Sequence, residues 1–402
     1  MSQSKKLIPK RRFHSFIYSD DWSLTRLENL GNFNPSSILP NQFEYVDLES
    51  VVGNQMVSHR TVDRKQAPSR AQRLAKKGDI FYQTVRPYQQ NNYFFNLLEE
   101  NYVFSTGYAQ IRPFGDGYFL FTKLQERKFL LEVLDNCIGT SFPAINSTAL
   151  AKIRVFTPLN IEEQYNIGNF FQKLDNLINT QQKKLEKAKT LKSAYLTEMF
   201  PNEGELKPKQ RFIKFNDDWK VFLIKELGDI HTGNTPSTAD KINWSVGEKG
   251  HVWVTPTDIK SLLISDSERY LTDIGWEKAR RIPENSILIT SIASIGKNSI
   301  NTVPVAFNQQ INAIIPYKNN AYFILSSMEK EKKRFSQLAG HTSMAIINKT
   351  EFENFTLIIP TEQEQTQIGN FFKLLDNKIA LEQKKLDKLK NIKQAYLNEM
   401  FV

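Results

Sequence analysis

Mostly apolar side chains recur at alternating spacings of four and three residues in two stretches of the chain. The first series is Leu174, Ile178, Gln181, Leu185, Ala188, Lys192, Tyr195 and Met199, and the second is Leu375, Ile379, Glu382, Leu386, Leu389, Lys393, Tyr396 and Met400. This spacing is typical of the contact seam of a coiled coil. No Gly or Pro interrupts residues 170–200. The pattern therefore predicts two long helices that pack on each other through these seams.

Both stretches carry signals that begin and end helices. Asn160 and Thr361 precede them as candidate N-caps, and acidic residues follow each one, where they suit the positive end of a helix dipole. Pro201 ends the first stretch. About 40 residues, with a rise of about 1.5 Å each, predict a rod of roughly 60 Å. The alternative is that each helix covers only its own neighbouring domain, but the likeness of the two stretches favours a common pairing.

The two helical stretches are copies of one another. Residues 167–200 and 368–401 are identical at 22 of 34 aligned positions. Shorter repeats lie upstream, where Trp22 and Trp219 each end an Asp-Asp-Trp sequence. The sequence between the repeats hardly matches. The repeated segments therefore form a common frame that carries two different inserts. This indicates that the molecule performs the same function at two places with two specificities.

The two inserts have the β-branched and aromatic runs of strands, broken by Gly, Pro, Asn and Asp. The strands that we predict are 43–52, 78–82, 102–104 and 118–121 in the first insert, and 251–254, 286–289, 303–307 and 311–315 in the second. The fold class is therefore α/β, of a mixed α+β kind, with a pseudo-twofold internal repeat. The predicted organisation is a first domain at 1–158, a helical region at 159–201, a second domain at 202–360 that opens with a linker at 202–209, and a helical region at 361–402.

Composition narrows the class of protein. The chain has 402 residues, of which 40% are hydrophobic and 24% charged, as in a soluble protein with two ordinary domains. No run approaches the roughly 18 apolar residues of a membrane span, and the N-terminus lacks the apolar core of a secretory signal. Cys137 is the only cysteine, which excludes an internal disulfide and fits a cytoplasmic location. The net charge of +10 favours a polyanionic partner.

Together these features resemble the specificity subunit of type I restriction–modification systems, over essentially the whole chain. Each helix ends in Tyr-Leu-x-Glu-Met-Phe and begins near a Glu-Gln dipeptide, at 163–164 and at 364–365. In both copies an Ile-Gly dipeptide is followed, eight residues after the Ile, by Asp-Asn. Each domain opens with a tryptophan followed five residues later by Leu27 or Ile224, and segments 253–259 and 291–296 are also similar to the family.

The resemblance implies a function and a set of partners. Each variable domain would be a target recognition domain that reads one half of a split, asymmetric site in double-stranded DNA. The two helices would form an antiparallel coiled coil that sets the spacing between the half-sites. Two methyltransferase (modification) subunits would dock on the helical regions, and restriction (translocase–nuclease) subunits would join them for cleavage.

Catalytic motifs are missing from the sequence. It contains no Asn/Asp-Pro-Pro-Tyr/Phe or Phe-x-Gly-x-Gly of a methyltransferase and no Gly-x-x-x-x-Gly-Lys-Ser/Thr for ATP. The five histidines are scattered and give no zinc-binding spacing. We interpret His341 as a loop residue rather than a catalytic residue. We therefore expect no catalysis, metal or cofactor on this chain, and S-adenosylmethionine, ATP and Mg²⁺ on its partner subunits.

The candidate DNA contacts of the first domain are basic and polar residues near a predicted strand. They are Arg60, Arg64, Arg70, Arg73 and Lys76 in the basic run 59–77, together with Thr84 and Arg86 just after the strand. Such side chains track phosphates, and Arg reaches guanine edges. Ser69-Arg70 also resembles a motif of such recognition domains. The alternative is a solvated helix whose buried side is Ala71, Leu74 and Ala75.

The candidates in the second domain are polar residues at predicted strand ends. They are Thr255, Thr257, Lys260, Ser291, Ser294 and Lys297. The alternative for all six is ordinary turn chemistry. Two other functions also stay open. A methyltransferase or nuclease with degenerate motifs would act on DNA by itself, and a coiled-coil adaptor would show no salt-dependent affinity for DNA.

Overall fold

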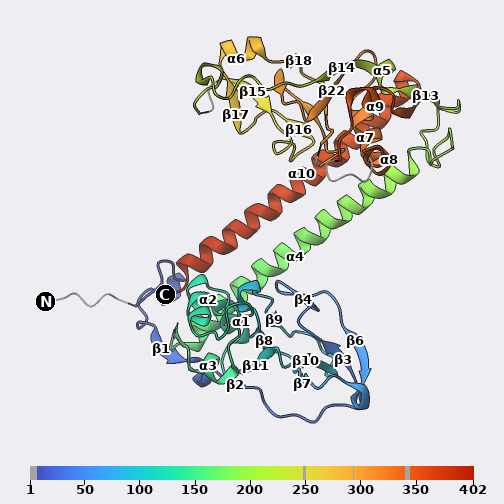
Figure 1. The fold of residues 1–402 in the computed structure, drawn as a ribbon. Coiled ribbons are helices and arrows are strands. Elements are labelled where there is room, and N and C mark those ends of the chain that lie inside the picture. Colours follow the sequence, from blue (N-terminus) through green and yellow to red (C-terminus); the bar gives the residue numbers. More distant parts are fainter. Residues whose placement is uncertain (1–6, 248–249, 293, 340–344) are drawn as a thin grey trace. The chain divides into compact units, whose positions relative to one another are not determined.

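The computed structural model describes residues 7–247, 250–292, 294–339 and 345–402. It divides into two compact units, one of residues 1–182 with 384–402 and the other of residues 183–383. Two long helices, α4 (Ile161–Glu198) and α10 (Glu362–Glu399), contribute to both units (Figure 1). Each unit therefore combines one α/β domain with the first part of one long helix and the last part of the other.

The first domain is built on two four-stranded sheets. Its first sheet has the order β2 (Gly31–Phe33), β11 (Tyr108–Pro113), β8 (Ile80–Gln83) and β9 (Tyr93–Phe94). Its second sheet has the order β6 (Arg60–Asp63), β3 (Gln42–Val46), β10 (Tyr102–Ser105) and β7 (Ala71–Leu74). The remaining elements are the ribbon β1 (Ser23–Arg26) with β12 (Arg154–Thr157), the hairpin β4 (Val51–Val52) with β5 (Gln55–Met56), and the helices α1 (Gly117–Lys123), α2 (Arg127–Asp135) and α3 (Ser147–Lys152).

The second domain is also built on two sheets, one of five strands and one of four. Its first sheet has the order β14 (Gly228–Thr232), β22 (Ile311–Pro316), β19 (Ile287–Thr290), β20 (Asn298–Asn301) and β16 (Leu263–Ile264). Its second sheet has the order β17 (Arg269–Leu271), β15 (His251–Val254), β21 (Val305–Phe307) and β18 (Arg281–Ile282). The remaining elements are the ribbon β13 (Lys220–Leu223) with β23 (Thr356–Ile359), and the helices α5 (Ile224–Leu227), α6 (Asp273–Lys278), α7 (Ala321–Lys330), α8 (Lys332–Gln337) and α9 (Lys349–Glu353).

The second sheets of the two domains share one topology although the sequences of the domains hardly match. In both, the two central strands of the second sheet are parallel, β3 with β10 and β15 with β21. In both, antiparallel strands flank this pair, β6 and β7 in one domain and β17 and β18 in the other. The second sheets therefore have the same strand order, whereas the first sheet of the second domain has one additional strand, β16, beside β20.

All but one of the predicted strands contain a strand of the structure. The exception is residues 118–121, which lie in α1, so that prediction was wrong. The Asp116 side chain accepts a hydrogen bond from the Phe119 amide at 2.6 Å and caps the helix. A short apolar run does not by itself distinguish a buried strand from a buried helix.

The Glu of each repeated Glu-Gln dipeptide anchors a domain to its helix. Glu163 is fully buried and accepts two hydrogen bonds from the Arg12 guanidinium, at 2.6 and 2.7 Å. In the second unit the buried Glu364 accepts two from Arg211 at the same distances. These bonds raise the pKa of each arginine. Paired, charge-assisted bonds of this kind hold both partners in a fixed geometry.

The repeated glycine lets a domain helix begin against a long helix. A Cβ atom on Gly168 would lie 2.0 Å from Oδ1 of Asp116, the N-cap of α1. In the second copy a Cβ atom on Gly369 would lie 2.2 Å from Oδ1 of Asn320, the N-cap of α7. Such distances leave no room for a side chain, which explains why the Ile-Gly dipeptide occurs in both copies.

Within the first unit the two long helices pack antiparallel. The Phe170 ring meets the Tyr396 ring edge-on, with centroids 4.9 Å apart. Five residues further along α4, Asp175 pairs with Lys393 at 2.7 Å. Contacts closer to the C-terminus of α4 are therefore made with residues closer to the N-terminus of α10, so the two helices run antiparallel. Asp175 also accepts a hydrogen bond from the Tyr118 hydroxyl at 2.8 Å, and burial beside this carboxylate raises the tyrosine pKa.

The second unit repeats these contacts. The Tyr195 and Phe371 rings meet edge-on at 4.8 Å, and Lys192 pairs with Asp376 at 2.8 Å. Asp376 again accepts a hydrogen bond from a domain tyrosine, Tyr322, at 2.8 Å. The acidic residue of each Asp-Asn dipeptide thus joins both helices and a domain. The helices pack on each other in both units, which excludes the alternative that each covers only its own domain.

The predicted seam side chains face away from solvent. Leu174, Leu185 and Leu386 are buried, and Ile178, Tyr195, Leu375, Ile379, Leu389 and Tyr396 are half-buried. The Asn160 side chain accepts a hydrogen bond from the Glu162 amide at 2.8 Å, which confirms the N-cap predicted for the first helix. No helix in the described ranges is long and apolar enough to cross a membrane.

Candidate nucleic-acid interface

The basic run of the first domain includes two strands at opposite edges of one sheet. Residues 60–63 are β6 and residues 71–74 are β7, with β3 and β10 between them. The alternative of a solvated helix with Ala71, Leu74 and Ala75 on its buried side is therefore excluded, although residues 64–66 form a short 3-10 helix. An edge strand leaves one row of backbone groups unpaired, so a partner can reach both strands. The side chains of β6 are mostly exposed, whereas in β7 only Gln72 is exposed.

All candidates in this run except Arg73 have exposed side chains, namely Arg60, Arg64, Arg70 and Lys76. The Arg60 guanidinium stands 5.2 Å from the centroid of the Tyr45 ring, and Tyr45 is its cross-strand neighbour in β3. Arg64 donates a hydrogen bond to the Leu39 carbonyl at 3.3 Å. An arginine held over an aromatic ring loses little further freedom when it binds a phosphate.

Arg73 differs from the other basic residues because it is half-buried. Its Nε is buried and has no hydrogen-bond partner among the described residues. Burial away from water lowers the pKa of this guanidinium. A buried donor without a partner is costly, and an acceptor on a ligand removes that cost. The Arg73 Nε is therefore a donor that an acceptor atom on a ligand could satisfy.

The two candidates that follow β8 have different surroundings. Thr84 is buried, and its hydroxyl donates to the Gly107 carbonyl at 2.8 Å. Thr84 is therefore no longer a candidate for a surface contact with DNA, because its hydroxyl is buried and donates its hydrogen bond within the domain. Arg86 has a left-handed backbone with φ 54° and its guanidinium stands 4.5 Å from the centroid of the exposed Phe142 ring. Left-handed non-glycine residues cluster at functional sites, which keeps Arg86 a candidate.

The candidates after β15 in the second domain take part in a turn. The Thr255 hydroxyl is 2.6 Å from the Asp258 carboxylate and 2.8 Å from the Thr257 hydroxyl. Lys260 is exposed and pairs with Glu268 at 2.8 Å. The hydrogen bonds of Thr255 are those of ordinary turn chemistry, whereas Thr257 and Lys260 remain accessible.

The candidates after β19 are also of two kinds. Ser291 is buried, and its hydroxyl oxygen accepts a hydrogen bond from the Asn312 amide at 2.8 Å. This removes Ser291 from the surface candidates for the same reason as Thr84. Ser294 and Lys297 are exposed. Both lie in the turn between β19 and β20, whose backbone is tied by hydrogen bonds to the Thr290 hydroxyl.

An aromatic and basic cluster in the second domain was missed from sequence. The Arg269 guanidinium lies 3.8 Å from the centroid of Trp244 and 5.2 Å from that of Trp253. Nearby, the His251 ring stacks on Trp276 with centroids 4.4 Å apart. Three of the five tryptophans lie within residues 244–276, and the basic sequence Lys-Ala-Arg-Arg follows at 278–281. That combination was the available signal, because bases and phosphates bind aromatic and basic groups.

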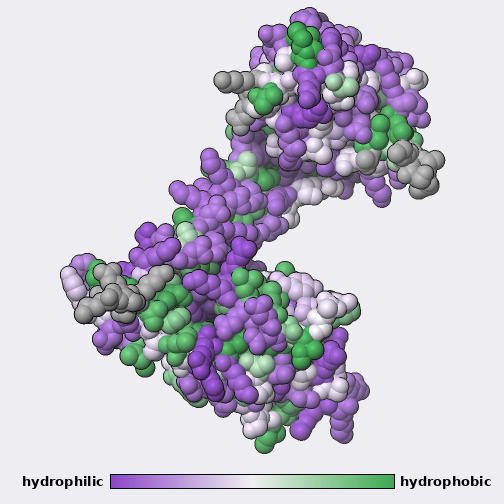
Figure 2. Space-filling model, turned by 60° about the vertical axis from the view of Figure 1, so that its left-hand side comes forward, coloured by the Kyte–Doolittle hydropathy of each residue, from purple (hydrophilic) through white to green (hydrophobic). Residues whose placement is uncertain are grey.

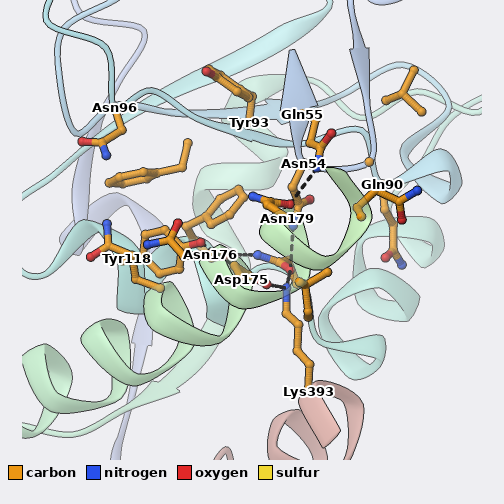
Figure 3. Close-up of a pocket in the computed structure, with 18 of the residues that line it drawn as sticks. Asn54, Gln55, Gln90, Tyr93, Asn96, Tyr118, Asp175, Asn176, Asn179 and Lys393 are labelled. Carbon is orange, nitrogen blue, oxygen red and sulfur yellow. Dashed lines mark hydrogen bonds and ion pairs between the residues drawn. The ribbon is translucent and has the colours of Figure 1, made fainter. Parts of the chain in front are cut away.

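A cleft of about 790 Å³ lies in the first unit, between the hairpin β4–β5 and the long helices (Figure 3). Amide side chains dominate its lining. Gln55 donates to Asn179 of α4 at 2.7 Å, and Asn54 donates to Gln125 at 3.1 Å. The second copy has Ala380 at the position of Asn179. The contact of Gln55 with Asn179, shown in Figure 3, connects the hairpin β4–β5 of the first domain to α4.

Hydrophilic residues dominate the face of the molecule shown in Figure 2, and hydrophobic residues are scattered there in small groups. Within the described residues no group of three His, Cys, Asp or Glu side chains is arranged to hold a metal ion. His341, interpreted above as a loop residue, lies outside the described residues. The exposed arginines and the aromatic groups beside them are therefore the features from which an interface with a polyanion can be built.

Comparison with known proteins identifies related sequences. A family model for the type I restriction modification DNA specificity domain matches residues 72–190 and 216–391. The HindI specificity subunit of Haemophilus influenzae is 23% identical over 426 residues, which cover 87% of this chain and 92% of that protein. The MjaIX specificity subunit of Methanocaldococcus jannaschii is 27% identical over 198 residues, 47% of this chain and 45% of that protein. The chain thus spans less than half the length of the MjaIX subunit.

Solved structures share the fold. A type I restriction–modification S subunit from M. genitalium matches with a TM-score of 0.67 and 15% identity, over 98% of this chain and 99% of that one. A chain from a study of assembly and conformational transition in a type I system matches with a TM-score of 0.53 and 20% identity, over 94% and 97% of the two chains.

Proposed function

Because the chain belongs to the type I restriction–modification DNA specificity family, we propose that it is the subunit that selects the DNA site for a complex of this type. It has no catalytic activity of its own. Each domain reads one half of a split, asymmetric site in double-stranded DNA. The observation that carries this proposal is the internal repeat, in which one topology and one set of helix contacts support two different surfaces.

Electrostatics supports DNA as the ligand. The net charge is +10, and exposed or half-buried arginines lie on the edge strands of the second sheet in both domains. Phosphate contacts of this kind supply affinity, while contacts to base edges supply specificity. Two inserts with different side chains on one topology suit two different half-sites.

The long helices suit the attachment of partner subunits. They form an antiparallel coiled coil on which two methyltransferase subunits dock, and restriction subunits join this complex. The apolar side chains of Tyr165, Leu177 and Leu374 are exposed on the helices, and a partner subunit that covers them would gain the free energy of burying them. S-adenosylmethionine, ATP and Mg²⁺ bind to those partner subunits, which supply the chemistry.

Sequencing of methylated DNA from the host, with and without this gene, tests the proposal. We expect a motif of two specific half-sites separated by unspecified base pairs, methylated only when the gene is present. The purified chain alone should neither methylate nor cut DNA. A methylation pattern that does not depend on the gene would contradict a role in site selection, and activity of the isolated chain would contradict the absence of catalysis.

A further inference from the structure

The ladders of the second sheet align the two domains residue by residue. We call a row of residues that are paired across neighbouring strands a rung. In the first domain one rung crosses all four strands and consists of Arg60, Tyr45, Val103 and Leu74. In the second domain the rung of the equivalent strands consists of Arg269, Trp253, Ala306 and Arg281. Each rung begins with an arginine on an edge strand, next to an aromatic residue on a central strand. Arg269 is therefore the structural equivalent of Arg60.

A backbone feature supports the same alignment. Gly78 and Asn285 both have a left-handed backbone, with φ 93° and 64°. Each lies two residues before the first residue of an equivalent strand, β8 or β19. Each also follows the last residue of its rung, Leu74 or Arg281, by four positions. The correspondence therefore extends through the turn that connects the two sheets.

The two equivalent arginines each lie over an aromatic ring of the neighbouring central strand. The guanidinium of each lies 5.2 Å from the centroid of the aromatic ring beside it, Tyr45 for Arg60 and Trp253 for Arg269. Both side chains are exposed. Arg269 is also stacked on Trp244, at 3.8 Å. The ring holds each cation in place and leaves its hydrogen-bond donors directed to solvent or to a ligand.

Neither arginine has a carboxylate partner in the described part of the chain, because the acidic residues beside each one are bonded elsewhere. Near Arg60, Glu44 is bonded to His59 at 2.7 Å and to Thr61 at 2.8 Å. Near Arg269, Glu268 pairs with Lys260 at 2.8 Å. Both guanidinium groups therefore remain available to an external anion.

A side chain that is common to two domains with different specificities performs what the two domains have in common. Both domains must bind the phosphate backbone of DNA, which carries no sequence information directly. This inference rests on the proposed function. We propose that Arg60 and Arg269 make the same contact in the two halves of the site, a charge-assisted hydrogen bond to a DNA phosphate. This pair fixes how each domain sits on the duplex, and the side chains that differ between the domains read the bases.

The salt dependence of DNA binding tests this inference. The complete complex with its methyltransferase subunits is used, with duplexes that carry both half-sites or a mismatch in one of them. A phosphate contact adds about 0.9 to the slope of log affinity against log salt. Arg60→Ala and Arg269→Ala should each lower the slope by about one. Each should weaken binding to matched and mismatched duplexes by the same factor, roughly tenfold.

Matched variants separate charge from packing. Arg60→Lys and Arg269→Lys keep the charge and should keep the slope, while Arg60→Gln and Arg269→Gln keep much of the side-chain stem and should lose it. The double alanine variant should lower the slope by about two, because the sites are independent. The control is Arg26→Ala, which removes an exposed arginine of β1 that pairs with Glu28. It should leave the slope unchanged.

Two results would overturn the inference. If the arginine variants bind like Arg26→Ala, the arginines only pack on their rings. If one of them changes the preference for a base at one position, that arginine reads sequence instead. Failure of the proposed function gives a different result, since the unmodified complex itself would then lack sequence-selective, salt-dependent binding.

Discussion

Replacing Glu364 by alanine is expected to release the second recognition domain from the start of α10. Glu364 is fully buried and receives both hydrogen bonds of a bidentate pair from Arg211, whose side chain is only 13% exposed. Removing one partner of a buried pair leaves the other charge without compensation, at a cost of about 3–5 kcal/mol. That is a large part of the stability of an ordinary domain. Thermal unfolding of the purified chain should show the loss.

The internal repeat and an exposed ion pair supply the controls for this variant. Glu163→Ala should have a similar effect in the first unit, because Glu163 and Arg12 are buried in the same geometry. Glu28→Ala removes the partner of Arg26 in an exposed pair and should cost less than about 1 kcal/mol. If Glu364→Ala proved as stable as Glu28→Ala, the anchoring role of the repeated Glu would be wrong.

Replacing Leu386 by aspartate is expected to separate the long helices. Leu386 is 1% exposed, and an unpaired carboxylate in such a position costs several kcal/mol. Leu185→Asp, at the equivalent seam position of α4, should act in the same way, since Leu185 is also 1% exposed. Both variants should unfold at a lower temperature and fail to assemble with methyltransferase subunits in size-exclusion chromatography.

A leucine on the outer side of α10 provides the matched control for stability. Leu374 is 69% exposed, so Leu374→Asp should change the free energy of unfolding by about 0.5 kcal/mol or less. Equal destabilisation by Leu374→Asp and Leu386→Asp would show that burial in the seam does not determine the effect.

The helical part of the fold could be predicted from sequence because its information is local and repeated. Spacings of four and three residues, an N-cap at Asn160 and the absence of Gly and Pro are visible without any knowledge of tertiary contacts. The Glu-Gln and Asp-Asn dipeptides could be noticed as repeats, but their roles could not be derived. Glu163 is anchored by Arg12, which lies 151 residues away.

The candidate DNA contacts were harder to predict, since burial and register decide which side chains are available. Thr84 and Ser291 follow strands, as expected of contact residues, yet both are buried and hydrogen-bonded within the domain. Arg269 was missed because the inserts differ in length. It follows Arg60 by 209 positions, whereas Ile368 follows Ile167 by 201, so an alignment of the repeated frame does not bring the two arginines together. Only the strand ladders do so.

Exchange of one recognition domain tests the central claim most directly. Residues 8–157 are replaced by the corresponding domain of another specificity subunit with a different methylated site, while the helices and the second domain are kept. Methylated DNA from hosts that carry the native or the exchanged chain is then sequenced. The account predicts that one half of the split motif changes and the other half is retained. A change in both halves, or an unchanged motif from an assembled complex, would contradict the claim that each domain reads one half-site.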